Sequence, residues 1–213
     1  MKIIRIKGFA SDQKVDIIIN SANGFLLLGS GGSGRIRKKS NILNKIQNKE
    51  FYKILDSLRP EIKNWYLSVY SKNKWDLTLA QLESLRILSK KKENKLNEFR
   101  RGTAVIQEKW NENDARIIIH AITMSYKLVR DEYHRKKGTK YLLQKSIIKA
   151  LDLAKGRGDS IAIPIMISRK NYGISVKESE KVIINAIKKY SFSKVILCYD
   201  NETTQKYFNK IKD

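Results

Sequence analysis

The chain has 213 residues, with 44 Lys and Arg side chains against 21 Asp and Glu, and a net charge of +23 at pH 7. This length is enough for one sizeable hydrophobic core, so we expect a single domain over residues 1–213. One cysteine excludes an intrachain disulfide, and with two histidines it offers no metal-ligand spacing. The amino terminus is too short and too alternating for a signal peptide, and no apolar run approaches membrane-spanning length. We therefore expect a cytoplasmic protein without membrane contact, metal or cofactor.

The excess of positive charge has two explanations. A field of this sign attracts polyanions such as nucleic acid and raises the rate of association with them. A lysine-rich surface also arises where it serves only solubility, thermophily or a genomic bias. The composition leaves both explanations open.

The first elements along the chain are two strands that end at a pair of asparagines. Residues 2–7 alternate in polarity, which is typical of an edge strand. The nearly unbroken, β-branched apolar run 15–19 predicts a strand buried on both faces. Asn20 and Asn23 follow it directly, and asparagine is depleted in strands and costly to bury without hydrogen-bond partners. These two side chains are therefore candidate site residues.

A glycine-rich loop follows the asparagines. It consists of Gly29, Ser30, Gly31, Gly32, Ser33 and Gly34. Its backbone N–H groups are free of side-chain cover, and it enters a helix predicted over residues 34–48, so it is suited to bind an anion. The P-loop pattern is absent, and the G-x-G-x-x-G spelling does not follow the strand directly as a dinucleotide fold requires. The loop is a candidate phosphate site of another kind, with plain turn chemistry as the alternative.

A long charged segment, residues 50–101, has the periodicity of helices. Residues 37–101 carry 17 basic and 7 acidic side chains, a net charge of +10, against +13 on the other 148 residues. The aromatic residues of this segment are Trp65, Tyr66, Tyr70 and Trp75. Basic residues interleaved with aromatic ones suit nucleic acid. Helical spacing beside apolar residues favours instead a packing role for the rings, which is the interpretation we prefer.

The second half of the chain alternates strands and helices. Strands are predicted at residues 103–107, 116–122, 161–167 and 195–199, and helices at 139–155, 176–190 and 202–211. This alternation predicts an α/β fold with helices on both faces of the sheet. His120 and Cys198 lie inside apolar runs, so we expect a hydrogen-bonded structural histidine and a buried cysteine.

Four segments, in this order, resemble the signatures of the macro domain family, whose members bind ADP-ribose and related metabolites. Residues 17–36, IIINSANGFLLLGSGGSGRI, are similar to its strand, Asn-Ala-Ala-Asn, short link and Gly-Gly-Gly-Val. Residues 102–121, 160–173 and 195–200 resemble its middle strand pair, its second phosphate loop and its last strand. The resemblance covers most of the chain and implies a three-layer α/β/α sandwich with a mixed central sheet. It also implies that residues 50–101 are a helical insertion.

The resemblance implies a two-walled site for ADP-ribose. Residues 29–33 would form one wall of a diphosphate cradle. The other wall would consist of Ser168, Arg169, Lys170, Asn171, Tyr172 and Gly173. Asn23 would bond the distal ribose, or position a water in hydrolysis, and Asn20 would line the site or bond the backbone of the turn. Tyr199 would stack on adenine, with Asp200 or Asn201 at the edge of the base.

Three positions depart from the family pattern. Where the family has a Gly-Asp that reads adenine, this chain has Gly8 and Phe9, so that Phe9 would stack on the base or Asp12 would replace the carboxylate. Family hydrolases often carry an aspartate where Ser33 stands, and a hydroxyl cannot act as a carboxylate base. Lys170 replaces a glycine of the second loop and would add a cation beside the phosphates.

The function that we expect is binding of ADP-ribose, free or attached to a protein or nucleic acid. Hydrolysis of the ADP-ribosyl bond is an activity that the resemblance leaves open. One alternative is a basic nucleic-acid-binding module in which the nucleotide pocket is degraded. Another is an ADP-ribose-phosphate phosphatase that would use Arg169 and Lys170.

Overall fold

The structure is a computed structural model of the whole chain, and it describes residues 1–90, 98–129, 132–136, 139–166 and 174–212. Its strands are β1 (Lys2–Lys7), β2 (Ile17–Asn23), β3 (Ala104–Gln107), β4 (Ile117–Val129), β5 (Glu132–Lys136), β6 (Ser160–Pro164) and β7 (Lys194–Tyr199). Its helices are η1 (Ala10–Asp12), α1 (Gly31–Lys39), α2 (Lys45–Ser57), α3 (Pro60–Asn73), α4 (Leu79–Ser89), α5 (Lys140–Ala154), α6 (Val176–Ile187) and α7 (Glu202–Lys212).

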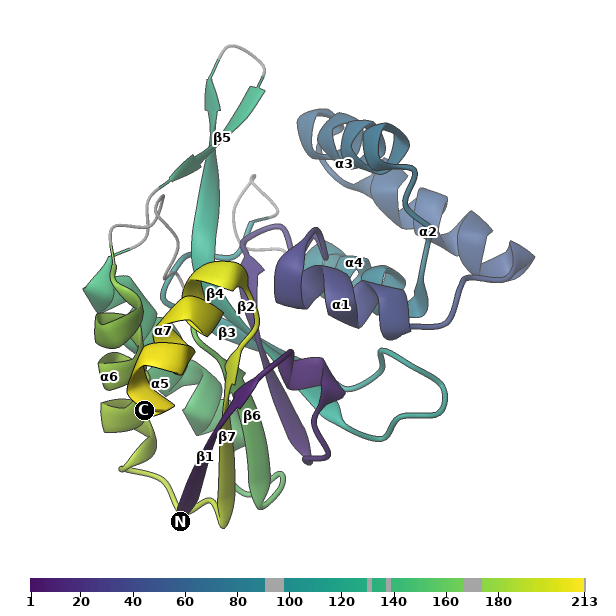
Figure 1. Cartoon of the computed structure of the whole chain (residues 1–213). Coiled ribbons are helices and arrows are strands. Elements are labelled where there is room, and N and C mark those ends of the chain that lie inside the picture. Colours follow the sequence, from purple (N-terminus) through teal and green to yellow (C-terminus); the bar gives the residue numbers. More distant parts are fainter. Residues whose placement is uncertain (91–97, 130–131, 137–138, 167–173, 213) are drawn as a thin grey trace.

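The strands form one mixed sheet in the order β1-β7-β6-β2-β4-β3. The pairs β1–β7, β7–β6, β6–β2 and β2–β4 are parallel, whereas β3 runs antiparallel to β4. The distal half of β4 extends beyond the sheet and pairs antiparallel with β5 (Figure 1). Parallel strands bring their carboxyl ends to one edge of the sheet, which is the edge where ligands bind in open α/β folds.

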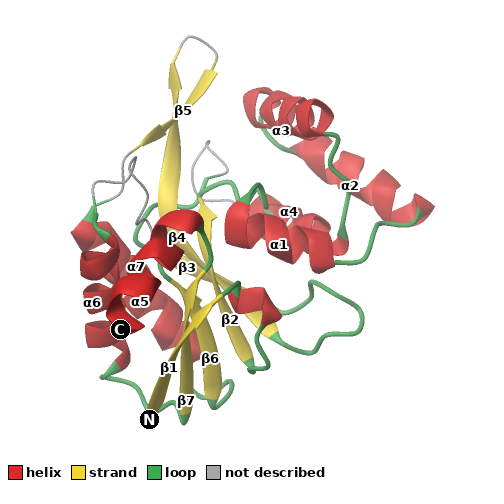
Figure 2. Ribbon diagram, viewed as in Figure 1, coloured by secondary structure: helices red, strands yellow, loops and turns green. Residues whose placement is uncertain are grey.

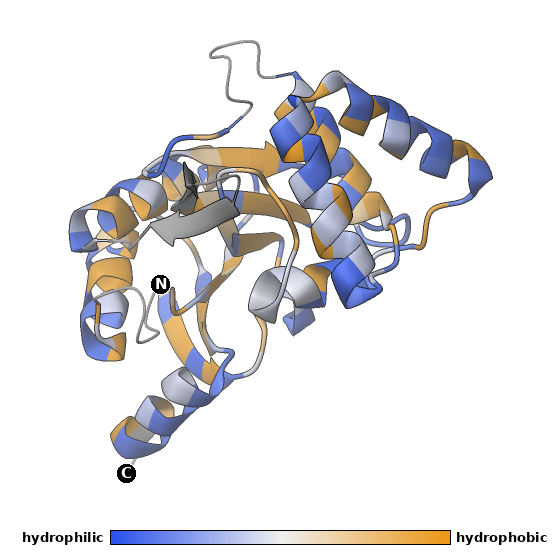
Figure 3. Ribbon diagram, turned by 90° about the horizontal axis from the view of Figure 1, so that it is seen from above, coloured by the Kyte–Doolittle hydropathy of each residue, from blue (hydrophilic) through white to orange (hydrophobic). Residues whose placement is uncertain are grey.

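Helices cover both faces of this sheet, so the fold is a three-layer α/β/α sandwich, as predicted. The helices α5, α6 and α7 lie on one side, and α1 and α4 lie on the other (Figure 2). Alternation along β2 explains the two layers, because Ile17 and Ile19 pack with α5 and α6 while Ile18 packs with α1. Seen from above, the strands form an apolar band between helices that are polar outside (Figure 3). Both faces are buried, as the nearly unbroken apolar run 15–19 predicts.

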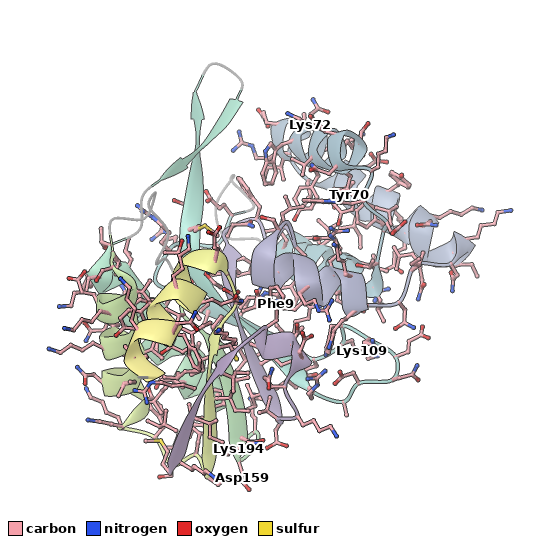
Figure 4. All side chains as sticks on the ribbon, in the orientation of Figure 1. Phe9, Tyr70, Lys72, Lys109, Asp159 and Lys194 are labelled. Atoms are coloured by element: carbon pink, nitrogen blue, oxygen red, sulfur yellow. The ribbon has the colours of Figure 1, made fainter. Side chains whose placement is uncertain are left out.

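The helices α2, α3 and α4 enclose a second hydrophobic cluster beside the sheet. It contains Tyr66, Tyr70 and the buried leucines of α4, and it receives Phe25 and Leu27 from the link after β2. Tyr70 points inward from α3, whereas Lys72 lies on the exposed outer side of that helix (Figure 4). The helical segment (residues 45–89) is therefore packed onto the chain that leads into the glycine loop.

Several predicted element bounds are wrong. The strand predicted at 161–167 ends at Pro164, and the helix predicted at 176–190 ends at Ile187. The helix predicted over residues 34–48 is two helices, because α1 ends at Lys39 and α2 begins at Lys45. Asn44 caps α2 by accepting from the backbone N–H groups of Ile46 and Gln47, and the Gln47 side chain bonds back to the Asn44 N–H. That capping box is legible in the sequence. The strand predicted over residues 116–122 continues to Val129 as one arm of the β4–β5 hairpin.

A chain of buried polar side chains runs through the sheet from β3 to β2. The Gln107 Nε2 donates to the carbonyls of Ala80 and Lys109, both at 2.9 Å, so its Oε1 faces His120 Nε2 at 2.7 Å. That oxygen only accepts, so Nε2 of the ring carries the proton and Nδ1 accepts from Asn20 Nδ2 at 3.0 Å. His120 is fully buried, as expected, and desolvation lowers its pKa to about 4. The ring thus stays neutral and holds the Asn20 amide in one orientation.

The lowered pKa makes a prediction for stability against pH. Unfolded chains take up a proton on His120 near pH 6.5 and the folded protein only near pH 4, so the free energy of unfolding falls as the pH drops through this window. The His120→Gln variant keeps one donor and one acceptor but does not titrate. Between pH 7 and pH 4.5 we expect its free energy of unfolding to fall by about 2–3 kcal/mol less than that of the wild type. Urea unfolding of both proteins at the two pH values measures it. Parallel pH profiles would contradict the assignment.

Candidate functional site

A cavity of about 330 Å³ opens over the carboxyl ends of β2, β6 and β7. The ends of β2 and β6 form its floor, with Asn20 and Asn23 on β2. The glycine loop, residues 29–33, forms one wall. The two remaining sides come from α3 with the turn after it and from the residues that follow β7. The cavity therefore brings together the asparagine pair and the glycine loop that the sequence singled out.

The glycine loop presents the amino-terminal end of α1 to the cavity. Gly31 has φ +63°, which only glycine adopts without strain, and a Cβ at Gly34 would lie 2.6 Å from the Gly29 carbonyl oxygen. The first intrahelical bond is donated by Gly34 to Ser30, and Ser30 makes no side-chain cap. The N–H groups of Gly31, Gly32 and Ser33 thus precede the hydrogen-bonded part of α1 and line the cavity. Together with the helix dipole they suit an anionic ligand.

The side chain of Asn23 folds the link between β2 and the loop. Its Oδ1 accepts from the N–H groups of Phe25 at 3.1 Å and Leu27 at 3.2 Å, and its Nδ2 donates to the Leu27 carbonyl at 2.8 Å. The turn places Leu26 at φ 53°, a left-handed conformation that costs about 1–2 kcal/mol. Asn23, expected to bond a distal ribose, is therefore engaged with the backbone and has the turn-holding role proposed for Asn20.

Side chains from three helices hold the same link. The N–H of Leu28 donates to Gln81 Oε1 at 2.7 Å, and Gln81 Nε2 donates to the carbonyl of Leu26 at 3.2 Å. Tyr66 donates its hydroxyl to the Phe25 carbonyl. The Nε of Arg37 donates to the Leu28 carbonyl at 3.0 Å. Since Tyr66 and Gln81 belong to α3 and α4, the helical segment sets the position of the glycine loop.

The polar chain that includes His120 ends at the cavity. The Ser33 hydroxyl lies 3.0 Å from Asn20 Oδ1 and 3.2 Å from the Ser21 carbonyl, both acceptors. Asn20 thus bonds His120 on one side and Ser33 on the other, and both Asn20 and Ser33 line the cavity. The Ser33 hydroxyl has one proton, which it donates to one of these two acceptors. Its oxygen can therefore only accept a hydrogen bond from a ligand.

Aromatic rings from the helical segment form the wall beyond Gly29. Trp65 and Trp75 are half-buried and line the cavity, and the six-membered ring of Trp75 lies 3.6 Å from where a Gly29 Cβ would stand. The guanidinium of Arg37 stands over Trp75, 4.2 Å from the ring centroid. Arg37 is only 4% exposed, and burial lowers its pKa. A cation is thus enclosed behind the loop. Among the described residues it forms no salt bridge, and the Asp76 carboxylate acts on it only at longer range, which partly offsets the lowering of its pKa by burial.

The opposite end of the cavity is polar. Asp200 and Asn201 follow β7, and Asn201 Nδ2 donates to Asp200 Oδ1 at 2.8 Å. The other carboxylate oxygen, Oδ2, lies 3.1 Å from where a Gly32 Cβ would stand. The glycine loop therefore lies between a carboxylate at one end and the tryptophan wall at the other.

Two residues expected to contact adenine lie elsewhere. Phe9 is half-buried, with the Arg35 guanidinium 5.9 Å from the centroid of its ring, and it does not line the cavity. Tyr199 has no exposed surface, because its ring packs against Tyr207 and Phe208 on the face covered by α6 and α7. A ring without exposed surface has nothing to offer a ligand. Asp12, the stand-in carboxylate, pairs instead with Arg35 and Lys39.

The second expected wall, Ser168 to Gly173, lies outside the described residues. Trp65, Val69, Asn73 and Trp75 also line the cavity. The sequence favours a packing role for the two tryptophans, with contact to nucleic acid as the alternative, and indicates no role for Val69 or Asn73. The helical spacing of the aromatic residues correctly predicts that Tyr66 and Tyr70 are core residues. Which ring of the segment faces the core and which faces the cavity depends on how α3 docks.

Other classes of site find no support in the described part of the chain. It contains no cluster of three His, Cys, Asp or Glu side chains that could hold a metal ion. Within the same residues, every helix is too short or too polar to cross a membrane. Cys198 is fully buried, and burial raises the pKa of its thiol well above the usual range, so it is not a nucleophile here.

The bonds of Asn23 lead to a stability prediction. Asn23→Ala leaves two N–H groups and one carbonyl of the buried link without their partner, so we expect the free energy of unfolding to fall by about 2–4 kcal/mol. Denaturant unfolding measures it. Asn64→Ala, at an exposed position of α3, is the matched control. Equal stability of the two variants would show that Asn23 does not hold the turn.

Comparison with known proteins identifies the fold. Neither a protein-family model nor a curated protein sequence matches the chain. The macrodomain of Oceanobacillus iheyensis with MES bound is similar in structure, with a TM-score of 0.59 at 19% identity over 98% of this chain and 89% of that one. The Trypanosoma brucei macrodomain in complex with ADP-ribose has a TM-score of 0.57 at 16% identity, over 99% of this chain and 69% of that one. The Thermus aquaticus DarG macrodomain has a TM-score of 0.53 at 13% identity, over 92% of this chain and 97% of that one. The chain therefore has the fold of a divergent macro domain.

Proposed function

We propose that the protein binds ADP-ribose, with the diphosphate on the amino-terminal end of α1. The observation that carries this proposal is the cavity at the carboxyl ends of the strands, into which Gly31, Gly32 and Ser33 present their N–H groups. Solved macrodomains with this fold contain ADP-ribose, which supports the same ligand class here.

The charge distribution around the loop supports an anionic ligand. Arg37 lies behind the loop, bonded to the Leu28 carbonyl and stacked on Trp75, and among the described residues it forms no salt bridge, with Asp76 as a more distant counter-charge. A buried cation whose counter-charge is distant is costly, and an anion bound at the glycine loop would offset part of that cost. A diphosphate at the α1 terminus is such an anion.

We propose binding rather than turnover as the main activity. In the described part of the cavity lining, the only acidic side chain is Asp200, which lies beside Gly32 and accepts from Asn201. His120 is neutral, fully buried and bonded on both nitrogens, so it cannot exchange protons with a ligand. Asn23, which would position a water in hydrolysis, is occupied by the backbone. Release of ADP-ribose from a modified protein or nucleic acid tests hydrolysis directly.

Calorimetric titration with ADP-ribose tests the proposal, and Gly32→Glu tests the loop. Gly31 has a positive φ, so a side chain there strains the backbone, whereas Gly32 accepts one with a small shift of Asp200. A carboxylate within about 4 Å of a diphosphate costs several kcal/mol, so we expect affinity to fall at least about 100-fold. Gly32→Ala is the control for the added Cβ. Unchanged affinity in Gly32→Glu would show that the diphosphate binds elsewhere, and no heat with the wild-type protein would refute ADP-ribose binding.

The net charge of +23 favours a second candidate, a polyanion such as nucleic acid, alone or carrying ADP-ribose. Contacts between lysines and phosphates release counterions, so the affinity for a single-stranded oligonucleotide should fall about 10-fold or more between 50 and 200 mM salt. Fluorescence anisotropy measures it. An affinity that does not change with salt, or no binding at 50 mM salt, would argue that the charge serves solubility only.

A further inference from the structure

We infer that Trp65 and Trp75 are the residues that distinguish ADP-ribose from ADP, by forming the wall against which the terminal ribose packs. The inference rests on the proposed function, because it assigns the two ends of the ligand to the two ends of the cavity. Both rings come from the helical segment, α3 and the turn after it.

The geometry divides the cavity at the glycine loop. A Cβ built on Gly29 would lie 3.6 Å from the Trp75 ring, and a Cβ built on Gly32 would lie 3.1 Å from the Asp200 carboxylate. A diphosphate on the α1 terminus therefore sends one arm of the ligand toward the tryptophans and the other toward Asp200. ADP-ribose has two such arms, adenosine and ribose, whereas ADP has only the adenosine arm.

The chemistry of the two ends decides which arm goes where. Adenine carries an exocyclic amine that donates hydrogen bonds, and the carboxylate of Asp200 at one end is an acceptor. The other end is lined by Leu27 and Val69 beside the tryptophans, with the exposed Asn73 at its edge. A ribose presents one apolar face of C–H groups and a rim of hydroxyls, and it fits an indole wall with an amide at its edge.

The tryptophan wall is held by contacts within the protein. Trp65 packs on Phe25, with 5.2 Å between ring centroids, and Phe25 is fixed by Asn23 and Tyr66. Trp75 is held between Arg37 and Tyr70. The guanidinium lies 4.2 Å from the Trp75 ring centroid, and the Tyr70 and Trp75 ring centroids are 5.6 Å apart in a T-shaped arrangement. Because both rings are fixed by these contacts, the entropy cost of ordering them on binding is small, and contact with the ribose contributes to affinity.

The experiment compares two ligands on four proteins. ADP-ribose and ADP are titrated by calorimetry into the wild type, Trp65→Ala, Trp65→Leu and the control Trp110→Phe, whose ring is fully buried in another cluster. We expect the wild type to bind ADP-ribose more tightly than ADP. Both Trp65 variants should lose about five- to tenfold in ADP-ribose affinity and less than twofold in ADP affinity. The leucine variant keeps apolar volume against Phe25, so it reports the ring itself should the alanine variant unfold.

Intrinsic fluorescence provides a second readout, because the chain has three tryptophans and one of them, Trp110, is buried away from the cavity. ADP-ribose should change the emission of the wild type, and ADP should change it much less. An equal response to ADP and ADP-ribose would overturn the inference by placing adenine on the wall. An unchanged ADP-ribose affinity in both Trp65 variants would overturn it while leaving ADP-ribose binding intact. No binding by the wild type would overturn both proposals.

Discussion

The site depends on one side chain amide, that of Asn23. At the end of β2 the chain must leave the sheet, turn through a left-handed Leu26 and deliver the glycine loop above the strand ends. A carboxamide can do this because its oxygen accepts from two N–H groups while its nitrogen donates to the Leu27 carbonyl. An aspartate could only accept and would leave that carbonyl without a partner. The chemistry of asparagine is thus required here by the backbone, before any ligand is considered.

The helical segment holds the same link by hydrogen bonds of the same kind. Gln81 accepts from one residue of the link and donates to another, as Asn23 does, and Phe25 and Leu27 are buried in the cluster that α2, α3 and α4 enclose. The position of the glycine loop is therefore coupled to the packing of these helices. A segment of this kind cannot be removed without leaving buried apolar and polar groups exposed, so it is part of the site even where it does not touch a ligand.

The sequence predicts the fold well because its signals are local. Apolar runs, helical spacing and the glycine loop each act within a few residues, and together they place the layers and the cavity wall. The turn-holding role expected for Asn20 belongs to Asn23, because the choice between backbone and ligand depends on where a carboxamide points. Tyr199 shares its face with Leu197 and Val195, so strict alternation along the strand would have placed it in the core. The contact of Gln81 with a link 53 residues away has no local signal.

The enclosed charge of Arg37 joins these observations into one electrostatic argument. Its guanidinium is stabilised by the Trp75 ring and the Leu28 carbonyl, which are weaker partners than a carboxylate would be. Both partners flank the glycine loop, so the positive charge lies next to that loop. Under the proposed function, an anion on the loop would offset part of the cost of burying this charge, and removing the charge would relieve that cost while weakening the binding of the anion.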